Sequence, residues 1–167
     1  ITLQGLDWPV LDGQLKYEVV SIKADDVRFS GFIVKNSGYA SLTDPGGVKV
    51  YDRRNVTVEN NIFENNFFAV YIQYGKNCII KNNKITGYGQ DEQQIGNGIH
   101  CWKSDSLVII GNQVKGHRDG IYFEFVTHSV IWRNISKQNV RYGLHFMFSN
   151  DDAYINNIFD GNGAGVA

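Results

Sequence analysis

The chain has 167 residues, of which 43% are hydrophobic and 20% are charged, and its formal net charge is −1 at pH 7. A chain of this length and apolar content can bury one sizeable core. Its near-zero net charge gives no electrostatic attraction to nucleic acid or to an anionic membrane, and no apolar run reaches the roughly 20 residues of a membrane-spanning helix. We therefore expect no nucleic-acid partner and no membrane-spanning segment.

The first repeated feature along the chain is a short cassette that returns five times. Each copy is a Gly or Ala followed by alternating apolar residues, and the copies lie at residues 47–50, 69–72, 98–101, 120–123 and 143–146. Their first residues are 22, 29, 22 and 23 positions apart, so one unit recurs, once with an insertion. A fixed period of this size is typical of stacked supersecondary units that cannot bury their apolar faces alone.

A second repeated feature runs in step with the cassette and consists of a short apolar run followed by asparagine. Asn61, Asn83, Asn112 and Asn134 end four of these runs and are separated by 22, 29 and 22 residues. The additional residues of the third unit therefore fall at 89–95, a polar stretch that we expect to form a loop. In stacked coils these asparagines would lie one above the other and pass amide hydrogen bonds along the stack.

Apolar residues within the cassettes are spaced two apart, as in Val70 and Ile72. This period is that of a strand, and no stretch shows the apolar stripe of an amphipathic helix. We therefore predict an all-β parallel β-helix, in which two or three short strands per coil pair with those of the next coil at roughly 4.8 Å. The last residues, 165–167, resemble the opening of another cassette, so we expect a single domain over residues 1–167 that is truncated at its C-terminal end.

The two cysteines fall in core-facing positions of neighbouring coils. Cys78 is in register with Val56 and Leu107, and Cys101 is in register with Ile72. No Cys-x-x-Cys pair is present, so we expect two buried thiols rather than a disulfide or a metal-binding thiolate.

Functional side chains are expected on the outward face of the cassette strands, where successive coils bring equivalent positions together. One outward column contains Lys49, Tyr71, His100, Tyr122 and His145, and the next contains Tyr51, Gln73, Trp102, Glu124 and Met147. This face is rich in aromatic residues and holds two of the four histidines and the only methionine. The other histidines, His117 and His128, fall near turns, where we expect them to be solvated.

A candidate copper site lies in the last complete copy of the cassette. His145 and Met147 are two apart on one strand, and Glu124 lies one coil away beside Met147. An imidazole, a thioether and a carboxylate together suit copper, because the soft sulfur of methionine favours the cuprous ion. His100 lies two coils from His145, roughly 10 Å away, which is too far to share one ion but near enough for a second metal station. The alternative is a His and a Met on a flat sheet face that a partner covers.

Carbohydrate binding is a competing use of the same face. Aromatic side chains could stack on a polysaccharide, and the candidates are Tyr71, Trp102 and Tyr122. Proton transfer could then involve His100, His145 or Glu124. This alternative predicts a carbohydrate-binding, lyase-like or epimerase-like β-helix protein.

The residues argue against catalysis on a polysaccharide. Glycoside hydrolysis usually needs two carboxylates, but the outward columns supply only Glu124, and Asp119 falls at a turn flanking a strand. A lyase would need a cluster of acids to hold calcium and a Lys or Arg as base. Only Lys49 is available for that role, and its columns contain no acidic neighbour.

The most specific segment runs from Arg141 to Asp151 and contains a His-aromatic-Met-aromatic-Ser-Asn-Asp motif at residues 145–151. With this motif, the Gly-Ile cassettes and the closing residues 162–167, nearly the whole chain resembles the NosD family. The resemblance implies a right-handed parallel β-helix in the periplasm that has no catalytic activity. It also implies work with an ATP-binding cassette transporter and a copper-carrying lipoprotein to assemble the copper centres of nitrous-oxide reductase. His145 and Met147 match the family motif, which does not settle whether they bind copper or dock the copper carrier.

Overall fold

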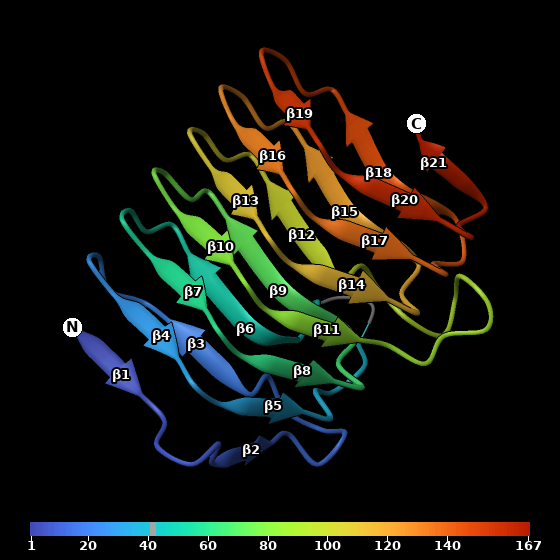
Figure 1. Cartoon of the computed structure of the whole chain (residues 1–167). Helices are drawn as coiled ribbons and strands as arrows, with labels where there is room; N and C mark the ends of the chain where they lie inside the picture. The colour runs from blue at the N-terminus through green and yellow to red at the C-terminus, as the bar shows by residue number, and fades with distance from the viewer. Residues whose placement is uncertain (41–42) are drawn as a thin grey trace.

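The computed structural model describes residues 1–40 and 43–167. In these residues the secondary structure consists of 21 short strands and no helix, so none of the described residues forms a helix that could cross a membrane. The strands form three parallel sheets of seven strands each. Successive coils stack from the N-terminal end to the C-terminal end (Figure 1), each coil contributing one strand to each sheet. The expected all-β parallel β-helix is confirmed, with three strands per coil.

The first sheet contains β1 (Thr2–Gln4), β4 (Arg28–Ser30), β7 (Thr57–Glu59), β10 (Ile79–Lys81), β13 (Val108–Ile110), β16 (Val130–Trp132) and β19 (Ala153–Ile155). The second contains β2 (Val10–Asp12), β5 (Ile33–Lys35), β8 (Ile62–Glu64), β11 (Lys84–Thr86), β14 (Gln113–Lys115), β17 (Ile135–Lys137) and β20 (Ile158–Asp160). The third contains β3 (Val20–Ile22), β6 (Gly46–Tyr51), β9 (Phe68–Gln73), β12 (Ile99–Trp102), β15 (Asp119–Glu124), β18 (Tyr142–Met147) and β21 (Ala164–Val166). The cassettes of the sequence are the strands of this third sheet.

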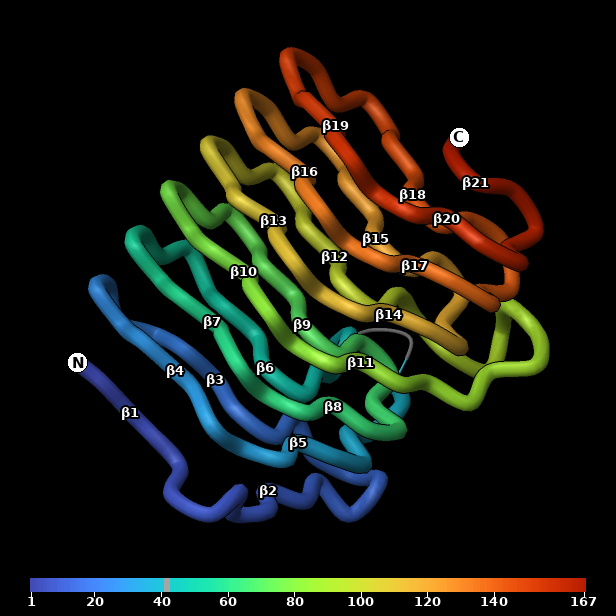
Figure 2. Tube along the Cα trace, in the orientation of Figure 1, coloured from blue at the N-terminus to red at the C-terminus, as the bar shows by residue number. Residues whose placement is uncertain are grey.

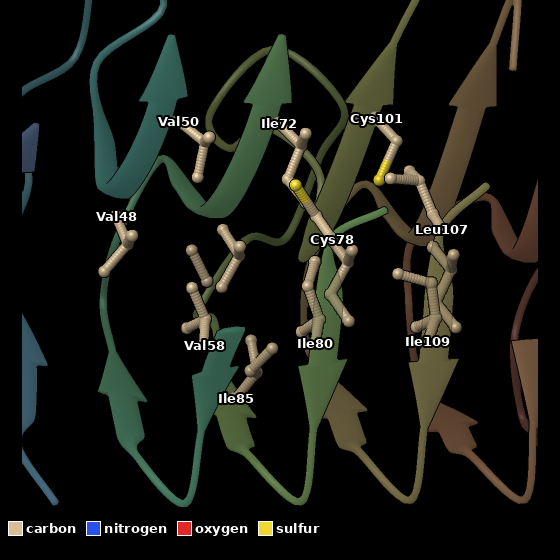
Figure 3. Packing of buried hydrophobic residues seen from close by; sticks show 14 of the residues in the cluster. Val48, Val50, Val58, Ile72, Cys78, Ile80, Ile85, Cys101, Leu107 and Ile109 are labelled. Atoms are coloured by element: carbon tan, nitrogen blue, oxygen red, sulfur yellow. The ribbon is translucent and has the colours of Figure 1, made fainter. Parts of the chain in front are cut away.

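Side chains that point inward from the three sheets fill one continuous core (Figure 3). Val48, Val50 and Ile72 of the third sheet face residues of the first sheet such as Ile80 across this interior. Both cysteines are free and fully buried, as expected, and burial raises the pKa of each thiol. Successive side chains of a strand lie on opposite faces, so the apolar residues of each cassette point into this core and the residues between them point outward.

The asparagine ladder is also confirmed. The side-chain oxygen of Asn83 accepts from the backbone N–H of Asn61 at 3.0 Å, and that of Asn112 accepts from the backbone N–H of Asn83 at 3.0 Å. The same pattern continues from Asn112 to Asn134 and on to Asn157. Each side chain thereby satisfies buried backbone groups at the turn from the first sheet to the second. These groups lie outside the strands, so the backbone hydrogen bonds between strands do not reach them.

The structure reveals a second inserted loop that the period did not show. The loop at residues 89–95 was expected and lies between β11 and β12, where it projects from the stack (Figure 2). The connection from β5 to β6 is also long, and the Tyr39 hydroxyl joins the two loops by donating to the Gln93 carbonyl at 3.1 Å. The first insertion escaped notice because β3, with Ser21 in the outward column, lacks the glycine and the aromatic residues of the later cassettes.

Candidate functional site

The outward columns of the third sheet have the register that the sequence predicted. Residues of the first column pair in the order Ser21, Lys49, Tyr71, His100, Tyr122 and His145. In the second column Tyr51, Gln73, Trp102, Glu124 and Met147 pair in the same way. Candidate residues from five coils therefore form two parallel rows on one face.

This face points away from the core, yet much of its first column is buried. Relative exposure is 5% for Lys49, 6% for Tyr71, 8% for His100 and 7% for Tyr122. The two inserted loops lie beside these side chains, since Asp44 of one and Glu92 of the other line a pocket with His100. Insertions at the same corner of two coils thus convert an open sheet face into a partly enclosed site.

The rings of the first column pack against one another along the stack, at tilted angles on both sides of His100 and edge to face between Tyr122 and His145. The His100 ring lies 4.5 Å from that of Tyr71 and 4.8 Å from that of Tyr122. The Tyr122 ring lies 4.9 Å from the His145 ring, so it separates the two imidazoles. His100 and His145 therefore occupy separate environments, as their spacing of two coils implied.

The hydrogen bonds of Asn97 determine the tautomer of His100. The Asn97 side-chain oxygen accepts from Arg118 Nε at 3.2 Å and from the backbone N–H of Asp119 at 3.3 Å. Its amide nitrogen, 3.1 Å from His100 Nδ1, must then be the donor, which leaves the imidazole proton on Nε2. Burial, with the nearby positive charge of Arg118, lowers the pKa of His100 to about 3, so the ring is neutral at physiological pH.

His145 has the opposite arrangement. Its Nδ1 lies 3.3 Å from Oδ2 of Asp119, a carboxylate whose side chain is fully buried. Arg141 donates to both oxygens of Asp119, at 3.0 and 2.7 Å, and so compensates the buried negative charge. Since Nδ1–H donates to the carboxylate, Nε2 of His145 carries the lone pair, on a side chain that is 15% exposed.

Asp119 is therefore a site residue that the sequence did not identify. It was expected at a turn, but it is the first residue of β15 and pairs with Tyr142 of β18. The recurrence of Arg-x-Gly at 118–120 and 141–143, with Asp in one copy and Tyr in the other, is the signal in the sequence that could have marked it. The pairing of Asp119 with Arg141 depends on side-chain geometry across 22 residues, which spacing alone does not predict.

Met147 lies beside this pair. It is in register with Glu124 and partly exposed, and its thioether sulfur accepts a hydrogen bond of 3.2 Å from the Tyr122 hydroxyl. Burial and the neighbouring Glu124 raise the pKa of Tyr122 to about 12, so this hydroxyl keeps its proton. In the part of the chain that the structure describes, no three His, Cys, Asp or Glu side chains gather closely enough to hold a metal ion. His145 and Glu124 are only two such side chains, so a metal ion bound there would need the Met147 sulfur as a third protein ligand.

The remaining histidines differ from one another. His117 is fully buried, which contradicts the expected solvation, because the loop after β11 packs over it and its Nδ1 lies 3.4 Å from the Gly96 carbonyl. Burial lowers the pKa of His117 to about 4. His128 is exposed, as expected, and its Nδ1 lies 2.9 Å from an Asp105 oxygen, a contact that raises the pKa of His128. Neither ring belongs to the outward face of the third sheet.

Two adjoining pockets lie on this face, and both include Asp44 and His100. One, of about 450 Å³, is lined by Tyr39, Asp44, Phe67, Phe68, Glu92, Gln93, His100 and Arg118. The other, of about 320 Å³, is lined by Thr43, Asp44, Lys49, Tyr71, Gln73, His100, Trp102 and Glu124. The predicted aromatic residues Tyr71 and Trp102 thus line a concave site, whereas Tyr122 lies between His100 and His145.

Two solved structures are similar to this chain to different degrees. The A-module of mannuronan C-5 epimerase AlgE6 from Azotobacter vinelandii has a similar structure, with a TM-score of 0.58 and 13% identity over 99% of this chain and 54% of that chain. PfbA, a surface adhesin of Streptococcus pneumoniae, matches with a TM-score of 0.43 and 13% identity over 86% of this chain and 46% of that chain. The chain thus spans about half the length of these solved structures, and no curated protein gave a significant match.

At 13% identity, the likeness to the epimerase module shows the fold alone. A family model described as "Right handed beta helix region" matches residues 19–167, which is most of the chain. The expected right-handed parallel β-helix is therefore confirmed, and the chain belongs to the right-handed β-helix family.

Proposed function

We propose that this chain is part of a periplasmic protein of the NosD type, which handles copper for the assembly of nitrous-oxide reductase. In this proposal, His145 and Met147 bind cuprous copper as cargo, with Glu124 as a third ligand. The cargo would arrive from a copper-carrying lipoprotein, and the protein would work with an ATP-binding cassette transporter. Support comes from the motif at residues 145–151 and from the surroundings of His145.

The observation that carries the proposal is the contact between Asp119 and His145 Nδ1. A metal-binding histidine usually donates its other ring N–H to a carboxylate, which sets the tautomer and makes the ligating nitrogen more basic. Asp119 is buried and its orientation is held by Arg141 through two hydrogen bonds. The Nε2 lone pair of His145 is therefore prepared before any ion arrives.

Met147 supplies the second ligand in a position that needs little rearrangement. Its side chain lies on the same face of β18 as His145, two residues away, and its sulfur bonds only weakly to the Tyr122 hydroxyl. Rotation of that hydroxyl frees a sulfur lone pair for a soft ion. The bound copper would supply no chemistry to a substrate, since it is itself the cargo, and Glu124 would balance its charge.

His100 is an unfavourable second ligand. Its Nδ1 accepts from Asn97, its Nε2 carries the proton, and Tyr122 separates it from His145. We therefore place the copper station at His145 and Met147 and assign His100 to the adjoining pockets.

The test is a titration with Cu(I) under a competing chelator. We expect His145→Ala and Met147→Leu each to abolish high-affinity binding, and Asp119→Asn to weaken it by about 10- to 100-fold. His128→Ala is the matched control, because this exposed histidine lies outside the face. Equal affinity in the wild type and in His145→Ala would refute the metal site, and so would the absence of binding by the wild type.

Acid-base chemistry on a polysaccharide is the second candidate, because Asp119 and His145 also form the arrangement of a general base held by a carboxylate. The other candidate base, Lys49, donates to the carbonyls of Thr43 and Asp44 at 3.0 and 3.3 Å, and burial lowers the pKa of its ammonium group. Incubation with alginate or pectin, followed at the absorbance of unsaturated uronates, tests lyase activity. Product formed by the wild type and lost in His145→Ala or Glu124→Gln would favour this candidate over copper handling.

A further inference from the structure

The outward side of the first sheet is apolar over its later strands. β13 reads Val-Ile-Ile and β16 reads Val-Ile-Trp, whereas β14, which follows β13 in the same coil, reads Gln-Val-Lys. The middle residues of these strands, Ile109, Ile131 and Val114, are buried in the core, so the first and third residues point outward. A strand that is apolar throughout is typical of a sheet with both faces covered. The first sheet therefore has the composition of a sheet whose outer side packs against a partner.

The outward apolar residues form one continuous patch, which we call the first-sheet patch. It consists of Ile79, Val108, Ile110, Val130, Trp132 and Ile155. Register places these side chains in two columns over β10, β13, β16 and β19, where most are partly buried by one another and Ile155 is 49% exposed. No described loop lies across this side of the stack (Figure 2), and the two insertions border the third sheet instead. Contiguous exposed apolar side chains of this kind mark interaction sites.

Charges of opposite sign border the two sides of the first-sheet patch. At the turn that precedes the first-sheet strands, the ring nitrogens of His128 lie 2.9 Å from an Asp105 oxygen and 3.9 Å from an Asp151 oxygen. Two carboxylates and one imidazole give this border a net negative charge. At the turn that follows these strands, the Arg133 guanidinium lies over the Trp132 ring, 4.5 Å from its centroid. Arg133 forms no ion pair within the described part of the chain, so this border offers a positive charge to a partner.

The dimensions of the first-sheet patch select one kind of occupant. Four strands at roughly 4.8 Å span about 19 Å along the stack, and three residues per strand span about 10 Å across it. A second copy of the chain would need to bury about 800 Å² per partner, roughly four times this area. An added strand would need a free sheet edge, but β10, β13 and β16 are each hydrogen-bonded to a strand on both sides. An α-helix about 10 Å wide and about 12 residues long has the same footprint as the patch.

We propose that the first-sheet patch docks one amphipathic helix of a partner protein, about three turns long and running along the stack. The apolar stripe of this helix covers the two columns of the patch. Its acidic flank faces Arg133, and its basic flank faces Asp105 and Asp151. The proposal is independent of the copper function, because His145 and Met147 belong to the third sheet.

The probe for this proposal is an amidated peptide of about 18 residues that has leucines at helical spacing, glutamates along one flank and lysines along the other. The chain has three tryptophans, so a Trp8→Phe, Trp102→Phe background leaves Trp132 as the only fluorescent indole. We expect the peptide to shift the Trp132 emission to shorter wavelength, with a Kd of about 0.1 mM or tighter. Two matched peptides, with lysines on both flanks or glutamates on both flanks, should bind about two- to fivefold more weakly.

One substitution in the patch and one outside it test the location. Ile110→Gln places a polar side chain in the middle of the patch and should weaken binding about tenfold. Ile135→Gln is the matched control, because Ile135 is a partly exposed outward residue of the second sheet, and it should leave the affinity unchanged. Far-UV circular dichroism confirms that each variant is folded.

Several results would overturn the proposal. They are the absence of an emission shift at about 1 mM peptide, equal affinity of the parent protein and Ile110→Gln, and equal affinity for the three peptides. A dimer in sedimentation equilibrium that Ile110→Gln dissociates would also overturn it, because the patch would then belong to a second copy. Cu(I) titration of Ile110→Gln should give the wild-type affinity, so a failure here is distinguishable from a failure of the copper site.

Discussion

The ladder of asparagines allows one prediction to be worked through in detail, for Asn112→Ala. The Asn112 side chain is fully buried. Its oxygen accepts from the backbone N–H and from the side-chain amide of Asn83, both at 3.0 Å. Its amide nitrogen donates to the carbonyls of Ile80 and Ile110 at 2.9 and 3.2 Å, and to the Asn134 side chain at 3.0 Å. Alanine removes all of these hydrogen bonds.

The cost is not the simple sum of the lost bonds, because several partners keep another one. The Asn83 side-chain amide still donates to Val58, and the Asn134 oxygen still accepts from the backbone N–H of residue 112. The backbone N–H of Asn83 loses its acceptor in a buried place, at about 1–3 kcal/mol, and each other lost bond costs about 0.5–1.5 kcal/mol. Because those partners keep other hydrogen bonds, we expect a loss near the lower end of this sum, about 3–4 kcal/mol in the free energy of unfolding, or roughly 10 °C in Tm for a chain of this size.

Thermal unfolding followed by circular dichroism measures this effect. Asn82→Gly is the matched control, because Asn82 is exposed, has a left-handed φ of 54° and directly precedes Asn83, the ladder residue one coil before Asn112. Glycine adopts this φ without strain, so the control should change stability by less than about 0.5 kcal/mol. A loss below 1 kcal/mol for Asn112→Ala, or an equal loss for the control, would refute the view that the ladder stabilises the turns.

Three further predictions follow from close approaches and from perturbed carboxylates. Gly120→Ala should destabilise the protein by about 1–3 kcal/mol, because its Cβ would clash with the buried Ser136 hydroxyl oxygen. Gly46→Ala, where the nearest atom is 3.5 Å away, should be tolerated, and equal chemical-denaturation midpoints for the two variants would contradict this. Burial raises the pKa of Asp152 to about 6. The ionised carboxylate therefore lowers the stability of the folded protein, an effect that is absent below about pH 4 and grows as the pH rises to about 6. Asp152→Asn should therefore gain about 1 kcal/mol at pH 7, after solvent screening, and nothing at pH 4. His128 should titrate above its ordinary pKa by NMR, and Asp105→Asn should lower that value, whereas an unchanged value would exclude the Asp105 contact as its cause.

Much of the fold was predictable because a stacked architecture translates sequence period directly into spatial register. The spacing of the cassettes placed Tyr122 beside His145 and Glu124 beside Met147, and both pairings are observed. The asparagine positions predicted the ladder for the same reason. The inserted loop after β5 was missed, because the strand before it carries too little of the cassette to show the period.

The sequence by itself determined the coil, the strand register, the core-facing columns and the set of side chains on the outward face. Only the tertiary structure decided which of those side chains are buried, that His100 is a donor at Nε2, and that Asp119 and Arg141 hold His145. The physical reason is that register follows from backbone periodicity. The state of an ionisable side chain follows instead from loops that cover it and from hydrogen bonds with residues more than 20 positions away, such as that between Arg141 and Asp119.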